Sequence, residues 1–196
     1  MSDRFRVSLG VGALGASALA LALAPTVLAE SYSWVEHTTS ESGGQGVSGA
    51  WMARLGFVLF GLAVLWISHL RGGRWGQPAT ALHVVFGVCM VGVAAFSLRS
   101  WEPNSLFDRT EDALHSVAAT VMGFAFAFGV TAVAFGRAAD GRRWRVLDVV
   151  AVAASVVLPV WMGLDGSIDG VLQRLMFAVA YLWYGREALE FQSPVR

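Results

Sequence analysis

Residues 101–120 read WEPNSLFDRTEDALHSVAAT, a short acidic loop that leads directly into an apolar helical segment. This change from a polar loop to an apolar run recurs along the whole chain. Of the 196 residues, 56% are hydrophobic and only 14% are charged, and the mean hydropathy is +0.58. Because a soluble domain usually carries roughly 25% charged residues, this composition indicates an integral membrane protein.

Six apolar runs approach the roughly 20 residues that an α-helix needs to cross about 30 Å of hydrocarbon. They cover approximately residues 7–29, 51–70, 79–98, 113–135, 146–164 and 171–185. Lipid cannot satisfy free backbone groups, and the runs are continuous rather than alternating, so they predict helices and not a β-barrel. We therefore expect residues 1–196 to form one all-α membrane domain, a bundle of six transmembrane helices.

The placement of arginine predicts the orientation of this bundle. With six spans, most of the 14 arginines fall on the side that carries both termini, and most acidic residues fall on the other side. Lys and Arg are enriched in cytoplasmic loops. The sequence thus predicts a multi-pass protein of the plasma membrane with both termini in the cytoplasm.

The first apolar run can also be interpreted as a secretory signal. Arg4 and Arg6 precede it, and residues 27–29 resemble a cleavage site. However, its apolar stretch exceeds the 7–15 residues that are usual for such a signal. Every fourth position is also small, a pattern that favours close helix packing in lipid: Gly12, Ala16, Ala20 and Ala24. We expect a retained transmembrane helix.

The acidic stretch before His115 is the first candidate site. Asp112 and Glu111 lie three and four residues earlier, so both can share a helix face with the imidazole, and Asp108 can cap the helix or bend inward. A histidine beside a carboxylate is typical of a general base and of a metal-bound histidine. Acids in a first helical turn are equally favoured by the helix dipole, so both interpretations remain open.

The loop between the first two runs supplies further candidates. Glu36, His37 and Glu41 lie in this glycine-containing stretch, where they are either metal ligands or acid–base groups, or parts of a solvated linker. Arg54 lies about one turn inside the second run, where a guanidinium is costly unless it is paired or reaches the surface. It is a candidate anion-binding group or a structural residue.

Several function classes receive no support from the sequence. The formal net charge is zero, so no electrostatic pattern points to nucleic acid. The single cysteine, Cys89, allows no intrachain disulfide and no thiolate metal cage. There is no P-loop, dinucleotide fingerprint, HExxH or Gly-x-Ser-x-Gly motif. No cofactor is therefore assigned.

Two short motifs resemble a known family. Ser40-Glu41-Ser42-Gly43 precedes the second run, and His115-Ser116-Val117-Ala118-Ala119 opens the fourth after an acidic loop. This pattern resembles the six-helix prokaryotic membrane proteins grouped as "domain of unknown function 998", which are distantly similar to the eukaryotic Frag1/DRAM/Sfk1 proteins. The resemblance implies a fold rather than an activity. Where members often have Asn in the first turn of the second helix, this chain has Arg54.

Spacing and resemblance together define a candidate outer polar cluster at the ends of the second and fourth helices: Ser40, Glu41, Arg54, Asp108, Asp112 and His115. Our first hypothesis is a protein that binds a lipid or small amphiphile, or an accessory protein. Membrane lipids are then its partners, together with a second copy or another membrane protein. The alternative is a membrane-embedded, metal-assisted lipid hydrolase with His115, Asp112 and His37 as ligands. A small-solute transporter is the third hypothesis.

Overall fold

The structure is a computed structural model that describes residues 2–164 and 166–190, and within this part of the chain it contains helices and no strands. The prediction of an all-α protein is thus confirmed. The helices are α1 (Asp3–Leu23), η1 (Ala24–Val27), α2 (Thr39–Ser42), α3 (Ala50–Trp75), α4 (Gln77–Ala95), α5 (Arg109–Ala139), α6 (Val146–Met162), η2 (Gly166–Ile168) and α7 (Asp169–Leu189). Each predicted apolar run coincides with one of the long helices.

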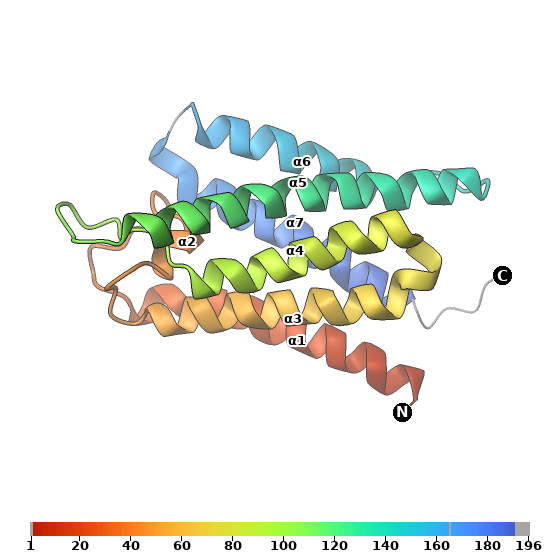
Figure 1. Cartoon of the computed structure of the whole chain (residues 1–196), viewed down its shortest axis with the longest axis horizontal. Helices are drawn as coiled ribbons and strands as arrows, with labels where there is room; N and C mark the ends of the chain where they lie inside the picture. The colour runs from red at the N-terminus through yellow and green to blue at the C-terminus, as the bar shows by residue number, and fades with distance from the viewer. Residues whose placement is uncertain (1, 165, 191–196) are drawn as a thin grey trace.

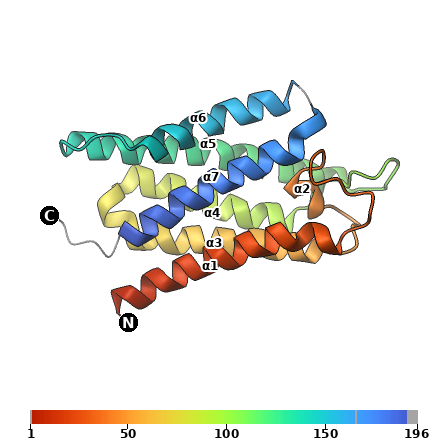
Figure 2. The ribbon, with the colours of Figure 1, turned by 180° about the vertical axis from the view of Figure 1, so that it is seen from behind.

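The long helices lie along one another in a bundle (Figures 1 and 2). The start of α1, the α3–α4 turn, the α5–α6 connection and the end of α7 lie at one end, which we call the terminal end. The other end, which we call the loop end, carries α2 and the long connections at residues 28–49 and 96–108. This arrangement places the predicted outer polar cluster at the loop end.

Four of the described helices are long and apolar enough to cross a membrane: α1 with η1, α3, α4 and α5. The last two, α6 and the segment Gly166–Leu189, pass the same test only together, and they are bent by 116°. Since α6 has 17 residues and α7 carries charges at both ends, neither qualifies alone. The chain is therefore a membrane protein with several apolar helices, while the count of six spans stays a prediction.

Helix α3 lies between α1 and α4 and packs closely against both. A Cβ atom added to Gly61 of α3 would lie 2.6 Å from the carbonyl oxygen of Gly87 in α4, so the two backbones touch where both residues lack side chains. On the other side, Gly56 of α3 would place a Cβ atom 2.5 Å from the side chain of Leu21 in α1. Small residues thus determine the spacing of these helices.

The small-residue stripe predicted for the first helix is packed only in part: Ala24 is buried, but the first half of the stripe is not. Gly12 and Ala16 are exposed, whereas Leu14 and Ser17 are buried. The hydroxyl of Ser17 donates to the carbonyl of Gly56 at 2.6 Å and lies 2.6 Å from the hydroxyl of Tyr181 in α7. The prediction was wrong for Gly12 and Ala16 because the small residues that allow the close approach belong to α3.

Candidate functional site

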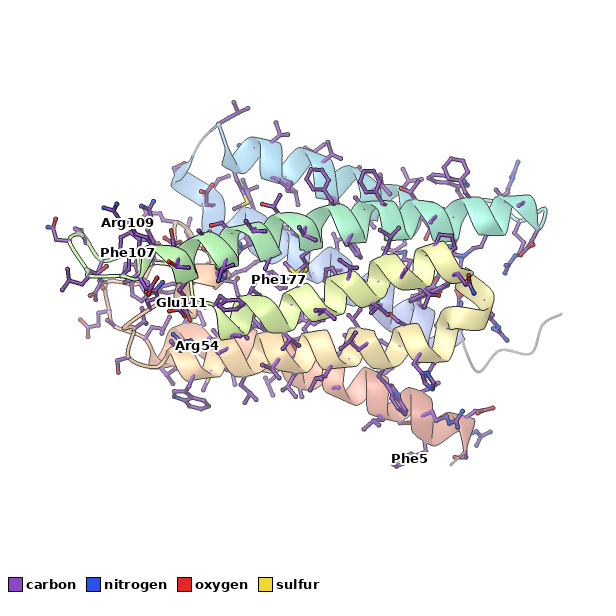
Figure 3. The ribbon with its side chains drawn as sticks, viewed as in Figure 1. Phe5, Arg54, Phe107, Arg109, Glu111 and Phe177 are labelled. Atoms are coloured by element: carbon purple, nitrogen blue, oxygen red, sulfur yellow. The ribbon has the colours of Figure 1, made fainter. Side chains whose placement is uncertain are left out.

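The predicted outer polar cluster is gathered at the loop end, but its members mainly bind loop backbone. Figure 3 shows Arg54 and Glu111 at this end, beside Phe107 and Arg109. Glu41 forms a capping box at the start of α2, where its carboxylate accepts from the backbone N–H of Thr38 at 2.6 Å and from its hydroxyl at 2.9 Å. This carboxylate therefore stabilises the short helix that carries Ser40.

Arg54 binds the chain that follows α2. Its Nε donates to the carbonyl of Gly43 and its Nη2 to the carbonyl of Gly44, both at 2.9 Å. The guanidinium is thus stabilised by two carbonyls at the end of α2. It also lines a shallow depression of about 490 Å³ together with Asp108 and Glu111. Arginine at this position joins α3 to the first loop.

Asp108 is the N-cap of α5. Its carboxylate accepts from the backbone N–H of Thr110 at 2.7 Å and of Glu111 at 3.1 Å. The hydrogen bonds from Glu111 and Thr110 hold the pKa of the Asp108 carboxyl below its ordinary value, since they favour the charged form. The sequence predicted this capping role as one of two options.

Gln45 is a residue that the sequence analysis missed. Its side-chain oxygen accepts from the N–H of Asp108 at 2.7 Å, and its Nε2 donates to the carbonyl of Ser97 at 2.8 Å and of Asp108 at 3.1 Å. One amide thus joins the first loop to the end of α4 and the start of α5. A glutamine in a glycine-containing loop gives no sequence signal for this role, because its partners are backbone groups about 50 to 60 residues away.

His115 is 2% exposed and faces the end of α4, not the lipid headgroups. Its Nδ1 lies 2.8 Å from the carbonyl oxygen of Phe96. A carbonyl only accepts, so Nδ1 carries the proton in the neutral ring. The carboxylates of Glu111 and Asp112 accept from the backbone N–H groups that follow α4, at 2.7 and 2.8 Å. These side chains share one helix face as predicted, and they hold the α4–α5 connection in place.

The three proposed metal ligands are not brought together. The Nδ1 of His37 accepts from the N–H of Ser33 at 2.9 Å, and its ring stacks on Trp101 with centroids 5.6 Å apart. Asp112 and His115 have the partners given above. Among the described residues, no group of three His, Cys, Asp or Glu side chains is placed to hold a metal ion.

A cavity of about 130 Å³ lies inside the bundle, on the loop-end side of its middle. Its lining is almost entirely apolar and comes from five long helices, with Phe57 and Phe60 from α3, Phe86 from α4, Phe126 from α5, small residues from α6 and Phe177 from α7. Figure 3 places Phe177 among the helices. Gly123 of α5 also lines this space, and a Cβ atom added there would meet no atom within 4 Å.

Polar groups lie at the loop end of this cavity. The N–H of Ser40 donates to the side-chain oxygen of Gln173 at 3.1 Å, and the amide of Gln173 donates to the Ser40 hydroxyl at 3.4 Å. Both residues line the cavity, as does Ser155, whose hydroxyl donates to the carbonyl of Ala151. Ser40 is therefore the member of the outer polar cluster that contacts the cavity directly.

The first loop forms a cover over the start of α7, which we call the roof (residues 32–42). Arg174 of α7 donates to the carbonyls of Trp34 at 2.8 Å and His37 at 3.1 Å and to the hydroxyl of Tyr32 at 2.7 Å. The close contact between the roof and α7 requires a glycine at position 170, because a Cβ atom there would lie 2.4 Å from the carbonyl oxygen of His37. The roof is thereby held to the bundle through backbone carbonyls.

A second buried polar group lies at the terminal end, and we call it the ion-pair cluster. Its residues are Arg71, Trp75, Arg137, Arg145, Asp148, Trp183, Glu187 and Glu190. The carboxylate of Glu187, 1% exposed, accepts from Arg71 at 2.8 Å, Arg145 at 2.9 Å and also Arg137. Asp148 accepts from Arg137 and from the indole of Trp183, the latter at 3.0 Å.

The sequence analysis missed this cluster. It ended the last helix at residue 185, which left Glu187 outside the predicted helix. Charges at several helix ends on the same side were the available signal, but pairing depends on which helix faces meet. In the structure, the cluster joins α3, α5, α6 and α7 at their terminal ends.

Comparison with known proteins supports the resemblance seen in the two short motifs. The chain matches the family described as "Protein of unknown function (DUF998)" over residues 9–187, which includes α3 to α6 and most of α1 and α7. Neither a curated protein nor a solved structure matches the chain. The activity must therefore be inferred from the site itself.

Proposed function

The chain belongs to the DUF998 family, and we propose that it is a membrane protein that holds the apolar chain of a lipid or similar amphiphile inside its helix bundle. The observation that carries this proposal is the cavity: aromatic and methionine side chains from four helices surround it, and its polar groups lie mainly at the loop end. Ligand sites are typically concave and apolar with a few oriented polar groups. An amphiphile has the same division into an apolar chain and a polar head.

In this proposal, the outer polar cluster has two roles. Ser40, together with Gln173, supplies hydrogen-bonding groups to the polar head of the amphiphile. Glu41, Asp108 and His115 keep the loops in position around the cavity, as their hydrogen bonds to backbone groups support. Arg54 lines the separate depression at the loop end and joins the first loop to α3 through the carbonyls of Gly43 and Gly44.

We further propose that all six long helices span the plasma membrane with both termini in the cytoplasm. Helix α6 would cover roughly 25 Å at 1.5 Å per residue, close to the hydrocarbon thickness. Most of the arginines in the described chain are near the terminal end, which favours the cytoplasmic side for that end. The buried pairing in the ion-pair cluster lowers the cost of Arg137 and Glu187 near lipid.

Photo-crosslinking of the purified protein tests the binding proposal. The protein in lipid nanodiscs is exposed to a long-chain fatty acid that carries a diazirine, and labelled peptides are identified by mass spectrometry. Label is expected on peptides that line the cavity, around Phe126 and Phe177. Gly123→Trp fills the cavity and should abolish this label. Phe124→Trp is the matched control, because residue 124 is 61% exposed on the outside of the same helix.

Label confined to outward-facing residues such as Phe124, unchanged by Gly123→Trp, would contradict the proposal. The metal-assisted hydrolase receives less support, because His37, Asp112 and His115 are held by separate partners. Elemental analysis of the wild type beside His115→Ala distinguishes the two functions: stoichiometric zinc that disappears in the variant would favour the hydrolase.

A further inference from the structure

The helices around the cavity differ in how closely they pack, and α6 buries the fewest residues. Of its 17 residues, only Asp148 and Ala151 are buried, and both lie in its first two turns. No residue from Val152 to Met162 is buried. By contrast, α3 buries residues along its whole length. The half of α6 nearest the loop end is thus in partial contact with the bundle.

This weakly packed half of α6 lies directly beside the cavity. Ala154 and Ser155 line the cavity, and neither side chain is large enough to fill the space behind it. Their neighbours Val156 and Val157 are 56% and 55% exposed and point away from the bundle. Figures 1 and 2 both show α6 along the edge of the bundle. Only one helix, with small inward-facing residues, separates the cavity from the surroundings on this side.

The two ends of α6 differ in how they are held. At the terminal end, Asp148 is bound by Arg137 and Trp183 of the ion-pair cluster. Near the loop end, Pro159 is exposed inside the helix, and its nitrogen cannot donate the helical hydrogen bond to the carbonyl of Ser155. Helix α6 is therefore anchored at one end and weakened at the other, beside the cavity.

Access to the cavity from water, past the roof, is closed by more hydrogen bonds than access past α6. The roof is held by three hydrogen bonds from Arg174 to the first loop and by backbone hydrogen bonds from Gly170 to Glu36 and from Val171 to Val35. Movement of the roof would break several of these bonds together. By contrast, movement of the loop-end half of α6 breaks mainly apolar contacts, and lipid can replace these contacts.

We infer that the ligand is a bilayer lipid, one acyl chain of which enters the cavity sideways from the membrane past the loop-end half of α6. This inference rests on the proposed function and names both the ligand class and its route. The chain passes beside Ala154 and Ser155, while the head group stays at the level of the loop end, near Ser40 and Gln173. A water-soluble amphiphile would instead have to pass the roof.

Two photoreactive probes separate these routes. The protein is reconstituted in phosphatidylethanolamine and phosphatidylglycerol vesicles, and it receives either phosphatidylglycerol with a diazirine near the end of one acyl chain or a short-chain diazirine fatty acid added from water. The phospholipid probe is expected to label peptides around Phe126 and Phe177. Ala154→Trp narrows the route and should reduce this label about tenfold, whereas Ala153→Trp, on the exposed neighbouring position, should leave it unchanged.

Label in the cavity from the water-soluble probe alone would overturn the sideways route and leave the proposed function intact. Equal labelling by the phospholipid in Ala154→Trp and Ala153→Trp would also overturn the route. If neither probe labels the cavity of the wild type, the proposed function itself fails. Circular dichroism of each variant in the same vesicles confirms that the helices are retained.

Discussion

The carboxylate of Glu187 lies 2.8 Å from the guanidinium of Arg71, which joins α7 to α3 across 116 positions of sequence. Both side chains are nearly inaccessible, at 1% and 5% exposure. A buried charge requires an opposite partner, because transfer from water is costly. This pair and the neighbouring arginines therefore determine how the terminal ends of four helices meet.

Replacement of Glu187 should be strongly destabilising. In Glu187→Gln, Arg71 loses its charged partner and Arg137 keeps only Asp148, while both arginines stay buried. Breaking one buried pair typically costs about 3–5 kcal/mol, so the thermal unfolding midpoint in detergent should fall by many degrees. Asp140→Asn is the control, since the Asp140 side chain is 68% exposed and lies outside the cluster. Equal midpoints for the two variants would argue against a structural role for the cluster.

Loss of the Gln45 amide should loosen the loops and leave the helices intact. Gln45→Leu removes three hydrogen bonds to loop backbone, and a hydrogen bond typically contributes about 0.5–1.5 kcal/mol. Hydrogen exchange measured by mass spectrometry should become faster at residues 97–108. Gln77→Leu, on an exposed position at the start of α4, is the comparison and should leave that exchange unchanged. Protection retained in Gln45→Leu would contradict this role.

Stability should depend on pH through Asp108. The folded-state pKa of its carboxyl is depressed by backbone hydrogen bonds from Glu111 and Thr110. A depressed pKa contributes stability that is present above the unfolded-state pKa and is lost as the pH falls through the folded-state value. Asp108→Asn keeps a capping side chain without a titrating group. The unfolding midpoint of this variant should therefore fall less than that of the wild type between pH 5 and strongly acidic pH.

Asp140→Asn is a suitable control for the same titration. Asp140 is a carboxylate on an exposed turn at the terminal end, where its side chain is 68% exposed and lies 3.2 Å from Arg142. Its replacement should leave the pH profile close to that of the wild type. Identical profiles for Asp108→Asn and the wild type would show that the cap does not titrate as expected.

Adding one methyl group at the α3–α4 contact should have a large effect. In Gly61→Ala, the new Cβ atom would lie 2.6 Å from the carbonyl oxygen of Gly87, so the helices must separate. Overpacking of this kind usually costs about 1–3 kcal/mol. Gly136→Ala is the matched control on α5, where a Cβ atom meets nothing within 4 Å; there, alanine should stabilise the helix by up to about 1 kcal/mol. Thermal unfolding of both variants measures the difference, and a stable Gly61→Ala protein would contradict the close contact.

The helices could be predicted from sequence because their cause is local. Continuous apolar runs of about 20 residues must form helices in lipid, whatever their neighbours are. Capping by Asp108 is also local, since its partners lie two and three residues further on. For the same reason, the shared face of Glu111, Asp112 and His115 followed from helical spacing alone.

The roles of these polar residues could not be predicted in the same way. His115 has its partner 19 residues away in Phe96, and Arg54 binds carbonyls of the first loop. Backbone carbonyls occur at every position, so the sequence contains no signal for which one a side chain will bind. Spacing indicated that polar groups gather at one end, and the fold determined that most of them hold loops there.

By itself, the sequence determined that this protein is a membrane-embedded, all-helical chain with polar groups concentrated at the helix ends, because hydropathy and helical spacing act over neighbouring residues. Only the tertiary structure decided that Glu187 pairs with Arg71, that Gln45 joins three segments and that a cavity lies behind Ala154 and Ser155. Each of these features depends on which faces of distant helices meet. Which faces meet depends on close packing at residues such as Gly61 and Gly87, where two helix backbones can touch because neither residue has a side chain.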